Sequence, residues 1–134
     1  YMGMAKNIKG TSNLGFWKLD EAKKFFKEAI PLLEKNGNDS LTGMLTNNLG
    51  LAFDYGGERD SAFYYFNKAI KICTRANAIV QVADTYNNMG LSFYYSQEGD
   101  SALYYYDIAI ATYGSLHDLS GQADVIVNKA IVHY

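Results

Sequence analysis

The chain contains an internal repeat, and this repeat limits its possible folds more than any other feature. Residues 46–85 align with residues 86–125 without a gap, and 16 of the 40 aligned positions are identical. Chance would give about one identity in every fifteen to twenty positions. A fixed period of this length is typical of stacked supersecondary units that bury one another's apolar faces.

The identical residues are mainly asparagine, glycine, alanine and aromatic residues. They are Asn47/Asn87, Asn48/Asn88, Gly50/Gly90, Leu51/Leu91, Phe53/Phe93, Tyr55/Tyr95, Glu58/Glu98, Asp60/Asp100, Ser61/Ser101, Ala62/Ala102, Tyr64/Tyr104, Tyr65/Tyr105, Ala69/Ala109, Ile70/Ile110, Ala83/Ala123 and Asp84/Asp124. The offset also reaches Gly10, Asp20, Ala22, Phe26, Ala29, Ile30, Asn128 and Ala130. We therefore expect one repeat domain, 1–134, from a longer protein. Its repeats would span about 6–45, 46–85, 86–125 and, in part, 126–134.

Composition excludes several classes of protein. Hydrophobic residues make up 49% of the 134 residues and charged residues 19%, which does not fit a disordered tail. One cysteine cannot form an internal disulfide, and two histidines with that cysteine do not suffice for a closed zinc site. The net charge is −2, so we expect no nucleic-acid partner. No apolar run approaches the length of a membrane span, so we expect no membrane partner either.

Apolar residues recur at helical spacing inside each repeat. Ala62, Phe66, Ala69 and Cys73 follow one another at intervals of three and four, which places them on one helix face. No segment has the period of a strand. The sequence therefore predicts an all-α fold, a right-handed α-solenoid of antiparallel helix pairs. Its seven helices would span about 3–17, 20–35, 40–55, 60–75, 79–95, 100–114 and 118–134.

Turn and cap residues set the expected helix ends. Asp60 and Asp100 are expected to be N-caps, because an Asp side chain accepts bonds from the first free backbone N–H groups. Tight turns are expected at 36–39, 75–77 and 116–118. Pro31 falls inside the second predicted helix, where it removes a backbone donor. We expect a bend or an early stop near residue 30, with Leu32 and Leu33 still packed.

The pattern of small and aromatic residues resembles the tetratricopeptide repeat (TPR) family in its long-repeat variant. That family places an aromatic residue, Leu-Gly and a second aromatic residue on one helix, and Ala, an aromatic residue and Ala on the next. The matching residues are Leu49, Gly50, Phe53, Ala62, Phe66 and Ala69, then Met89, Gly90, Phe93, Ala102, Tyr106 and Ala109. Gly50, Gly90, Ala62 and Ala102 are expected to let paired helices approach closely. The resemblance implies a scaffold that binds a peptide or partner segment in a concave groove.

An asparagine ladder is the strongest candidate for that groove. Asn48, Asn88 and Asn128 occupy the same position in successive repeats, and Asn47 and Asn87 precede two of them. Asparagine is unfavourable inside helices, because its side chain competes for backbone bonds. In the long-repeat relatives, asparagines at this register bind a peptide backbone, which suits an amide that both donates and accepts. The alternative is that the asparagines bond neighbouring repeats to one another.

Other residues could share the groove face. Leu51 and Leu91 would lie there with Tyr55 and Tyr95, unless they pack on the adjacent helix. Asp84 and Asp124 are expected at the starts of first helices, where an acid complements the helix dipole; in the groove they would favour basic or neutral ligands. The complete set of candidate partner-binding residues is Asn47, Asn48, Leu51, Tyr55, Asp84, Asn87, Asn88, Leu91, Tyr95 and Asn128.

The remaining features favour binding over catalysis. The Lys and Arg clamp of the chaperone-binding relatives is missing, so a chaperone C-terminus is not the expected ligand. No phosphate-binding loop, nucleophile motif or metal-spaced pattern occurs, so we expect no enzyme, no catalytic residue, no metal and no cofactor. His117 should lie in a turn, His133 at an aromatic packing register, and Cys73 in the core. We expect a solvated face at Lys23, Lys24 and Lys27, with an acidic-partner patch as the alternative.

The second helices carry adjacent tyrosines, Tyr64-Tyr65 and Tyr104-Tyr105, of which some must be exposed. The leading function is therefore a protein–protein interaction module, located in the cytoplasm. The alternatives are a sensory or regulatory domain of a larger bacterial regulator and a self-association module. The apolar terminal helix at 118–134 could form a homodimer in the last case.

Overall fold

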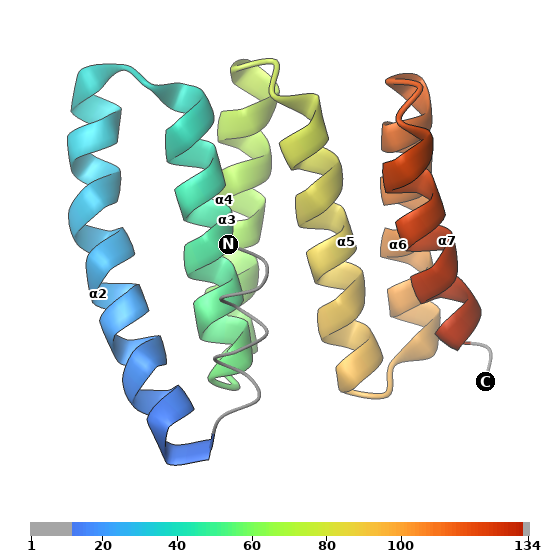
Figure 1. Ribbon diagram of the computed structural model, residues 1–134, viewed down its shortest axis with the longest axis horizontal. Helices are drawn as coiled ribbons and strands as arrows, with labels where there is room; N and C mark the ends of the chain where they lie inside the picture. Colours follow the sequence, from blue (N-terminus) through green and yellow to red (C-terminus); the bar gives the residue numbers. More distant parts are fainter. Residues whose placement is uncertain (1–11, 133–134) are drawn as a thin grey trace. The chain divides into compact units, whose positions relative to one another are not determined.

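The computed structural model of the protein describes residues 12–132, with side chains described from Lys18 onward. Expectations for Gly10 and His133 lie outside the described residues. Within 12–132 the chain forms six α-helices and no strand, so the all-α prediction is confirmed (Figure 1). The helices are α2 (Ser12–Asn36), α3 (Asp39–Tyr55), α4 (Arg59–Arg75), α5 (Ile79–Tyr95), α6 (Gly99–Ser115) and α7 (Leu119–Val132).

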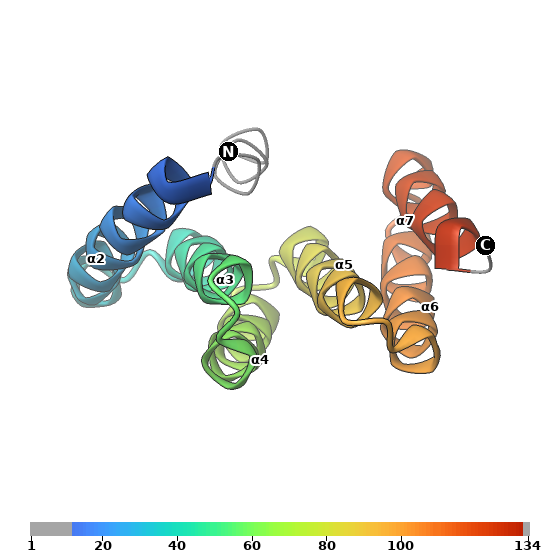
Figure 2. The same ribbon diagram turned by 90° about the horizontal axis from the view of Figure 1, so that it is seen from below.

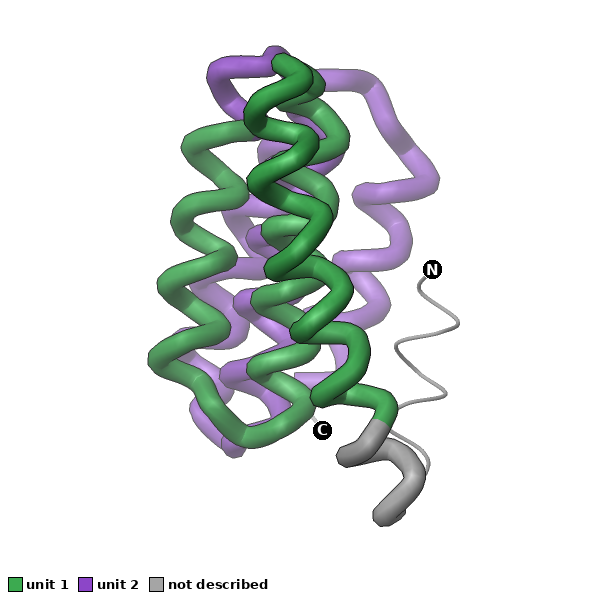
Figure 3. The backbone as a smooth tube through the Cα atoms, turned by 90° about the vertical axis from the view of Figure 1, so that its left-hand side faces the viewer, with its two compact units in different colours: residues 1–72 green, residues 73–134 purple. Residues whose placement is uncertain are grey.

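The chain divides into two compact units, residues 1–72 and residues 73–134 (Figure 3). In unit 1, α2 packs against α3, and α3 packs against the part of α4 that belongs to this unit. In unit 2, α6 lies beside both α5 and α7, as the end-on view of Figure 2 shows. Turns of two or three residues join consecutive helices, so neighbours are antiparallel, as in helical repeat solenoids.

The helix bounds reproduce the 40-residue period. α3, α5 and α7 begin at residues 39, 79 and 119, and α4 and α6 begin at 59 and 99. Side-chain burial follows the same period, because residues 61–70 and 101–110 have the same degree of exposure at every position. The repeated sequence therefore produces a repeated pattern of buried residues.

A left-handed residue ends each helix from α2 to α6. Gly37, Gly57, Asn77, Gln97 and His117 all have positive φ, and they are evenly spaced at half the repeat period. Each lies in a pair of backbone bonds that closes the helix end. At the end of α3, Glu58 N–H donates to the Phe53 carbonyl at 2.9 Å and Gly57 N–H to the Asp54 carbonyl at 3.0 Å. This pattern satisfies carbonyls that the helix end leaves free and reverses the chain within three residues.

The predicted break between residues 17 and 20 is wrong, because α2 continues through it. The 40-residue offset places Trp17 at the position of Gly57 and Gln97. Tryptophan has no preference for the left-handed conformation. With no residue to reverse the chain, the backbone stays helical from Ser12 onward.

Pro31 also fails to stop the helix, since α2 runs on to Asn36. Leu32 is 69% exposed, so the expectation that it stays packed is wrong, whereas Leu33 is half-buried.

The N-cap predictions for Asp60 and Asp100 are also wrong. Both aspartates lie in the first turn, and the N-cap of α6 is Glu98. There the two acids complement the helix dipole.

Small residues allow close contact within the helix pairs, as expected. A Cβ atom added to Gly50 would lie 2.7 Å from Cδ1 of Phe66, and one added to Gly90 would lie 2.5 Å from Cδ1 of Tyr106. Phe66 and Tyr106 are both fully buried, and so are Ala62 and Ala102. The glycines of the first helices therefore make room for the aromatic rings of the second.

We predict that Gln97→Gly stabilises the protein. A residue with a side chain pays about 1 kcal/mol or more in the left-handed conformation, so the free energy of unfolding should rise by about 0.5–1 kcal/mol. Urea unfolding followed by circular dichroism measures this change. Gln97→Ala is the control and should leave stability near that of the wild type, since alanine meets the same strain. A destabilised Gln97→Gly variant would contradict this account of the turns.

We predict that Gly90→Ala destabilises the protein despite the better helix propensity of alanine. Overpacking a buried ring costs about 1–3 kcal/mol, which exceeds the gain of about 1 kcal/mol from propensity. Gly114→Ala is the matched control, because its new methyl group would meet only the flexible end of Gln122. Thermal unfolding should show a lower midpoint for Gly90→Ala and little change for Gly114→Ala.

Candidate functional site

The ladder asparagines lie on α3, α5 and α7, in surroundings that differ. Asn47, Asn48 and Asn88 are buried, with 3%, 8% and 3% of their surfaces exposed, whereas Asn87 and Asn128 are half-buried. Asn128 Nδ2 donates to Asn87 Oδ1 at 3.1 Å, which joins α7 to α5 within unit 2. For this pair the structure supports the alternative that the amides bond neighbouring repeats.

Asn48 has a different environment. Its Oδ1 atom is buried and accepts no hydrogen bond from any described residue. Another buried polar residue of the same helix does have a partner, because the Thr46 hydroxyl donates to the Thr42 carbonyl one turn earlier. A buried acceptor without a donor costs about 1–3 kcal/mol. The Oδ1 atom of Asn48 is therefore a buried acceptor that could still take a hydrogen bond.

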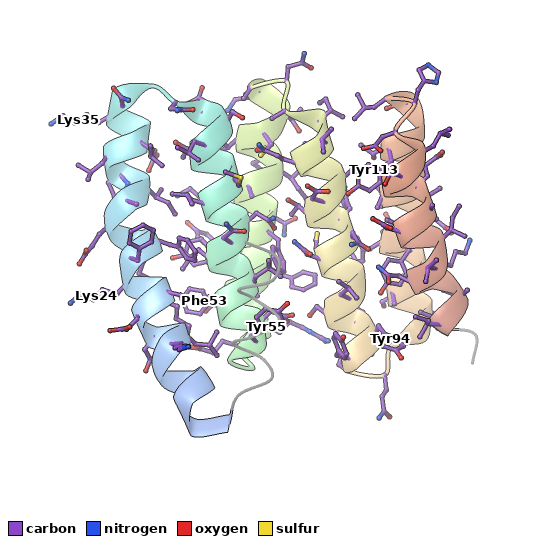
Figure 4. All side chains as sticks on the ribbon, viewed as in Figure 1. Lys24, Lys35, Phe53, Tyr55, Tyr94 and Tyr113 are labelled. Carbon is purple, nitrogen blue, oxygen red and sulfur yellow. The ribbon has the colours of Figure 1, made fainter. Side chains whose placement is uncertain are left out.

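The apolar groove candidates take part in packing. Leu51 is 5% exposed, and Leu91 packs against the core cluster of unit 2. Tyr55, near the end of α3 (labelled in Figure 4), packs on Leu19 and Ala52. Tyr95 is 60% exposed and makes an edge-on ring contact with Tyr94. Of these four residues, only Tyr95 offers a large exposed surface.

Asp84 is not at the start of a helix, so the dipole interpretation of this residue is wrong. It lies in the second turn of α5, and neither α5 nor α7 has an acid in its first turn. The hydroxyl of Tyr113 on α6 (labelled in Figure 4) donates a hydrogen bond to Asp84 Oδ1. Asp124, its repeat equivalent, is exposed. The two aspartates therefore have separate roles despite their shared register.

Burial dominates the ionisation of Asp84 and Tyr113. It raises the pKa of the Asp84 carboxyl, an effect that the Tyr113 hydrogen bond opposes and the nearby Asp118 charge reinforces. It also raises the pKa of Tyr113, together with the bond to Asp84. Burial raises the pKa of Cys73 to about 11, with Asp84 as a further cause. Cys73 is fully buried and donates to Gln81 Oε1 at 3.3 Å, so its predicted place in the core is confirmed.

The lysines of α2 only partly form the expected solvated face. Lys23 pairs with Glu58 at 2.6 Å, and its Nζ atom lies 4.7 Å from the centre of the Phe53 ring. Lys27 Nζ lies 5.2 Å from the same ring centre, and Tyr65 stacks on Phe53 at 5.3 Å. Lys24 is exposed. The spacing of Lys23 and Lys27 at i and i+4 could have indicated this cation–π cluster, which sequence reasoning missed.

The paired tyrosines divide into one exposed and one packed residue in each repeat. Tyr64 and Tyr104 are 61% and 62% exposed. Tyr105 stacks on Phe93 at 5.6 Å, as Tyr65 stacks on Phe53.

His117 lies in the turn where it was predicted. No group of His, Cys, Asp and Glu residues able to hold a metal ion occurs in the described part of the chain.

Comparison with known proteins identifies a likeness in fold. No protein-family model matches the chain, and no curated protein matches it in sequence. Among solved structures, the chain is similar to BtubC (BKLC) from P. vanneervenii, with a TM-score of 0.61 and 18% identity over 89% of this chain. The match covers 58% of the BtubC chain. At this identity the likeness shows a shared helical fold alone.

Among residues 12–132, no helix is long and apolar enough to cross a membrane.

We predict that Asp84→Asn stabilises the protein at neutral pH. The folded-state pKa of Asp84 is raised, so its contribution to stability is complete below the ordinary carboxyl pKa and falls as the pH rises through the folded value. Asparagine keeps an acceptor for the Tyr113 hydroxyl without a buried charge. Urea midpoints should therefore differ most near pH 7 and converge near pH 4. Asp124→Asn is the control, because Asp124 is exposed. A gain for Asp84→Asn that does not change with pH would refute the assignment.

Proposed function

We propose that this chain is a protein–protein interaction module of the TPR type. It binds a peptide or partner segment in a concave groove, and it has no enzymatic activity of its own. The proposal is supported by helix pairs that recur with a 40-residue period and by the small and aromatic residues at their contacts. We place the module in the cytoplasm.

The unpaired acceptor of Asn48 carries the proposal. Asn48 keeps 8% of its surface exposed while its Oδ1 atom is buried, so the side chain would have to turn this atom outward to meet a ligand N–H group. A backbone N–H of an extended peptide would satisfy Oδ1 and recover the cost of its burial. Since every peptide has a backbone, this contact would not depend on ligand sequence. Within unit 2, Tyr95 is 60% exposed and is the candidate for contacts with ligand side chains, which would provide selectivity.

The paired asparagines would have a supporting role. Asn128 and Asn87 bond to each other, so they position α7 against α5 and leave less capacity for a ligand. Within the ladder, this predicts a division between an asparagine that contacts ligand and asparagines that hold repeats together. The division can be tested, because the two kinds of substitution should affect different measurements.

Self-association is the second candidate function. The terminal helix α7 exposes Leu119, Ile126, Val127 and Ile131, of which Leu119 is 75% exposed. Large exposed apolar surfaces often mark sites of protein–protein contact. A homodimer through α7 would cover these side chains. A third candidate function is that of a sensory or regulatory domain in a larger bacterial regulator. Such a domain would bind its ligand or partner through the same groove.

We predict that Asn48→Ala weakens peptide binding by about tenfold, the value of one well-placed hydrogen bond, without lowering the melting temperature. The probe is a peptide selected against the wild type from a displayed library of random sequences, and calorimetric titration measures its affinity. Asn87→Ala is the matched control and should lower stability more than affinity, because Asn87 Oδ1 already accepts a bond from Asn128. Equal affinities for Asn48→Ala and the wild type would remove Asn48 from the site.

A further inference from the structure

The helices α4 and α6 each carry an exposed tyrosine at the same register of the repeat. Tyr64 of α4 is 61% exposed and Tyr104 of α6 is 62% exposed. The repeat therefore places a large aromatic ring twice where a surface helix normally presents a polar or charged side chain. Tyr64 lies in the middle of the chain, so exposure at this register does not depend on where the sequence begins or ends.

The exposed ring of Tyr104 is supported by the packed rings of unit 2. It meets Tyr105 edge to face, with ring centres 5.0 Å apart and ring planes at 84°. Tyr105 in turn stacks on Phe93 at 5.6 Å and on Tyr86 at 6.4 Å. A ring that is already ordered loses little conformational entropy when a ligand packs on it. Tyr104 is therefore well prepared for contact with a partner.

The charge around the exposed tyrosine differs between the two helices. Asp100 and Asp107 lie four residues before and three residues after Tyr104, so the three form one stripe about two turns long. Both acids are exposed, and α6 contains no Lys or Arg. The helix α4 has Asn67 at the position of Asp107 and carries four basic residues against one acid. The same ring thus lies in an acidic surface on α6 and in a basic surface on α4.

The acidic stripe of α6 already receives a cation from within unit 2. Lys129 of α7 donates from Nζ to Asp107 Oδ1 at 2.7 Å. The side chains of Lys129 and Asp107 remain 37% and 58% exposed, and an ion pair with this exposure adds little stability. A cation from another molecule can therefore replace Lys129 or share the carboxylate with it.

We propose that this face of α6 binds an arginine-bearing segment of a basic partner protein. One arginine side chain lies over the Tyr104 ring, with its guanidinium within reach of Asp100 or Asp107. A guanidinium stacks on an aromatic face, is more weakly hydrated than an ammonium, and donates to carboxylates in a planar fork. Arginine therefore fits this combination of ring and acids better than lysine does.

The charge of the whole unit favours the same partner. Residues 73–134 contain two Lys and Arg residues against six Asp and Glu, a formal net charge of −4. This charge attracts a basic segment and repels an acidic protein or a nucleic acid. The surface is separate from the proposed Asn48 contact, because Asn48 belongs to α3 in unit 1. The inference goes beyond peptide binding in the groove and does not depend on it.

An NMR titration of the ¹⁵N-labelled full chain at low salt tests the proposal. The probe is an acetylated and amidated nonapeptide in which arginine alternates with glycine. The control peptide has citrulline in place of each arginine, which keeps nearly the same shape without the charge. The titration measures both the affinity and the positions of the residues whose amide signals move.

The arginine peptide should move the signals of residues 100–107 most, and added salt should weaken its binding to the wild type. Tyr104→Ala should weaken binding about two- to fivefold, the value of one exposed cation–π contact, whereas Tyr104→Phe should bind like the wild type. Tyr64→Ala is the matched control and should have no effect, because its ring is equally exposed but has basic surroundings. Lys129→Gln should strengthen binding by up to about fivefold, because it removes the competing cation.

Several outcomes would overturn the proposal. Absence of binding at low salt, or equal binding of the arginine and citrulline peptides, would show that this face takes no cation. Equal losses for Tyr104→Ala and Tyr64→Ala, or weaker binding for Lys129→Gln, would assign the attraction to another part of the surface. Asn48→Ala should leave binding of the arginine peptide unchanged, so this proposal and the groove proposal can fail separately.

Discussion

The reversal of the backbone at the end of each helix from α2 to α6 is the constraint on which the rest of the structure depends. A left-handed residue at positions 37, 57, 77, 97 and 117 ends these helices and returns the chain alongside them. Glycine takes this conformation without strain, and asparagine takes it more readily than most residues, but Gln97 and His117 must be held in it by the bonds around them. The antiparallel helix pairs, and the contacts of Gly50 and Gly90 with the rings opposite, follow from these reversals.

The place where the reversal is missing is equally informative. At residue 17 the period puts a tryptophan where a left-handed residue would be needed, and α2 stays helical. Phe25 is 61% exposed and meets the Phe26 ring edge-on, whereas Tyr65 and Tyr105 each stack on a phenylalanine ring.

Buried polar groups separate residues that the repeat makes equivalent. Asn128 and Asn87 satisfy each other, while the Oδ1 atom of Asn48 has no donor among the described residues. Asp84 accepts a bond from a buried tyrosine, while Asp124 faces solvent. Identical residues at identical register thus have different hydrogen-bond partners, because their neighbouring helices differ. These differences support the assignment of a ligand contact to Asn48 and of a structural role to Asn87 and Asn128.

The sequence by itself determined the all-α class, the 40-residue period and most helix bounds to within a residue or two. These features depend on local preferences and on the spacing of apolar side chains, which act over a few residues. Only the tertiary structure decided that α2 runs through residue 17 and that Asp84 is paired with Tyr113. It also decided that Lys23 lies over Phe53, that Asn128 bonds Asn87, and that Asn48 Oδ1 has no donor among the described residues. Burial and pairing depend on what the neighbouring helix places opposite a residue, and the spacing within one helix does not contain that information.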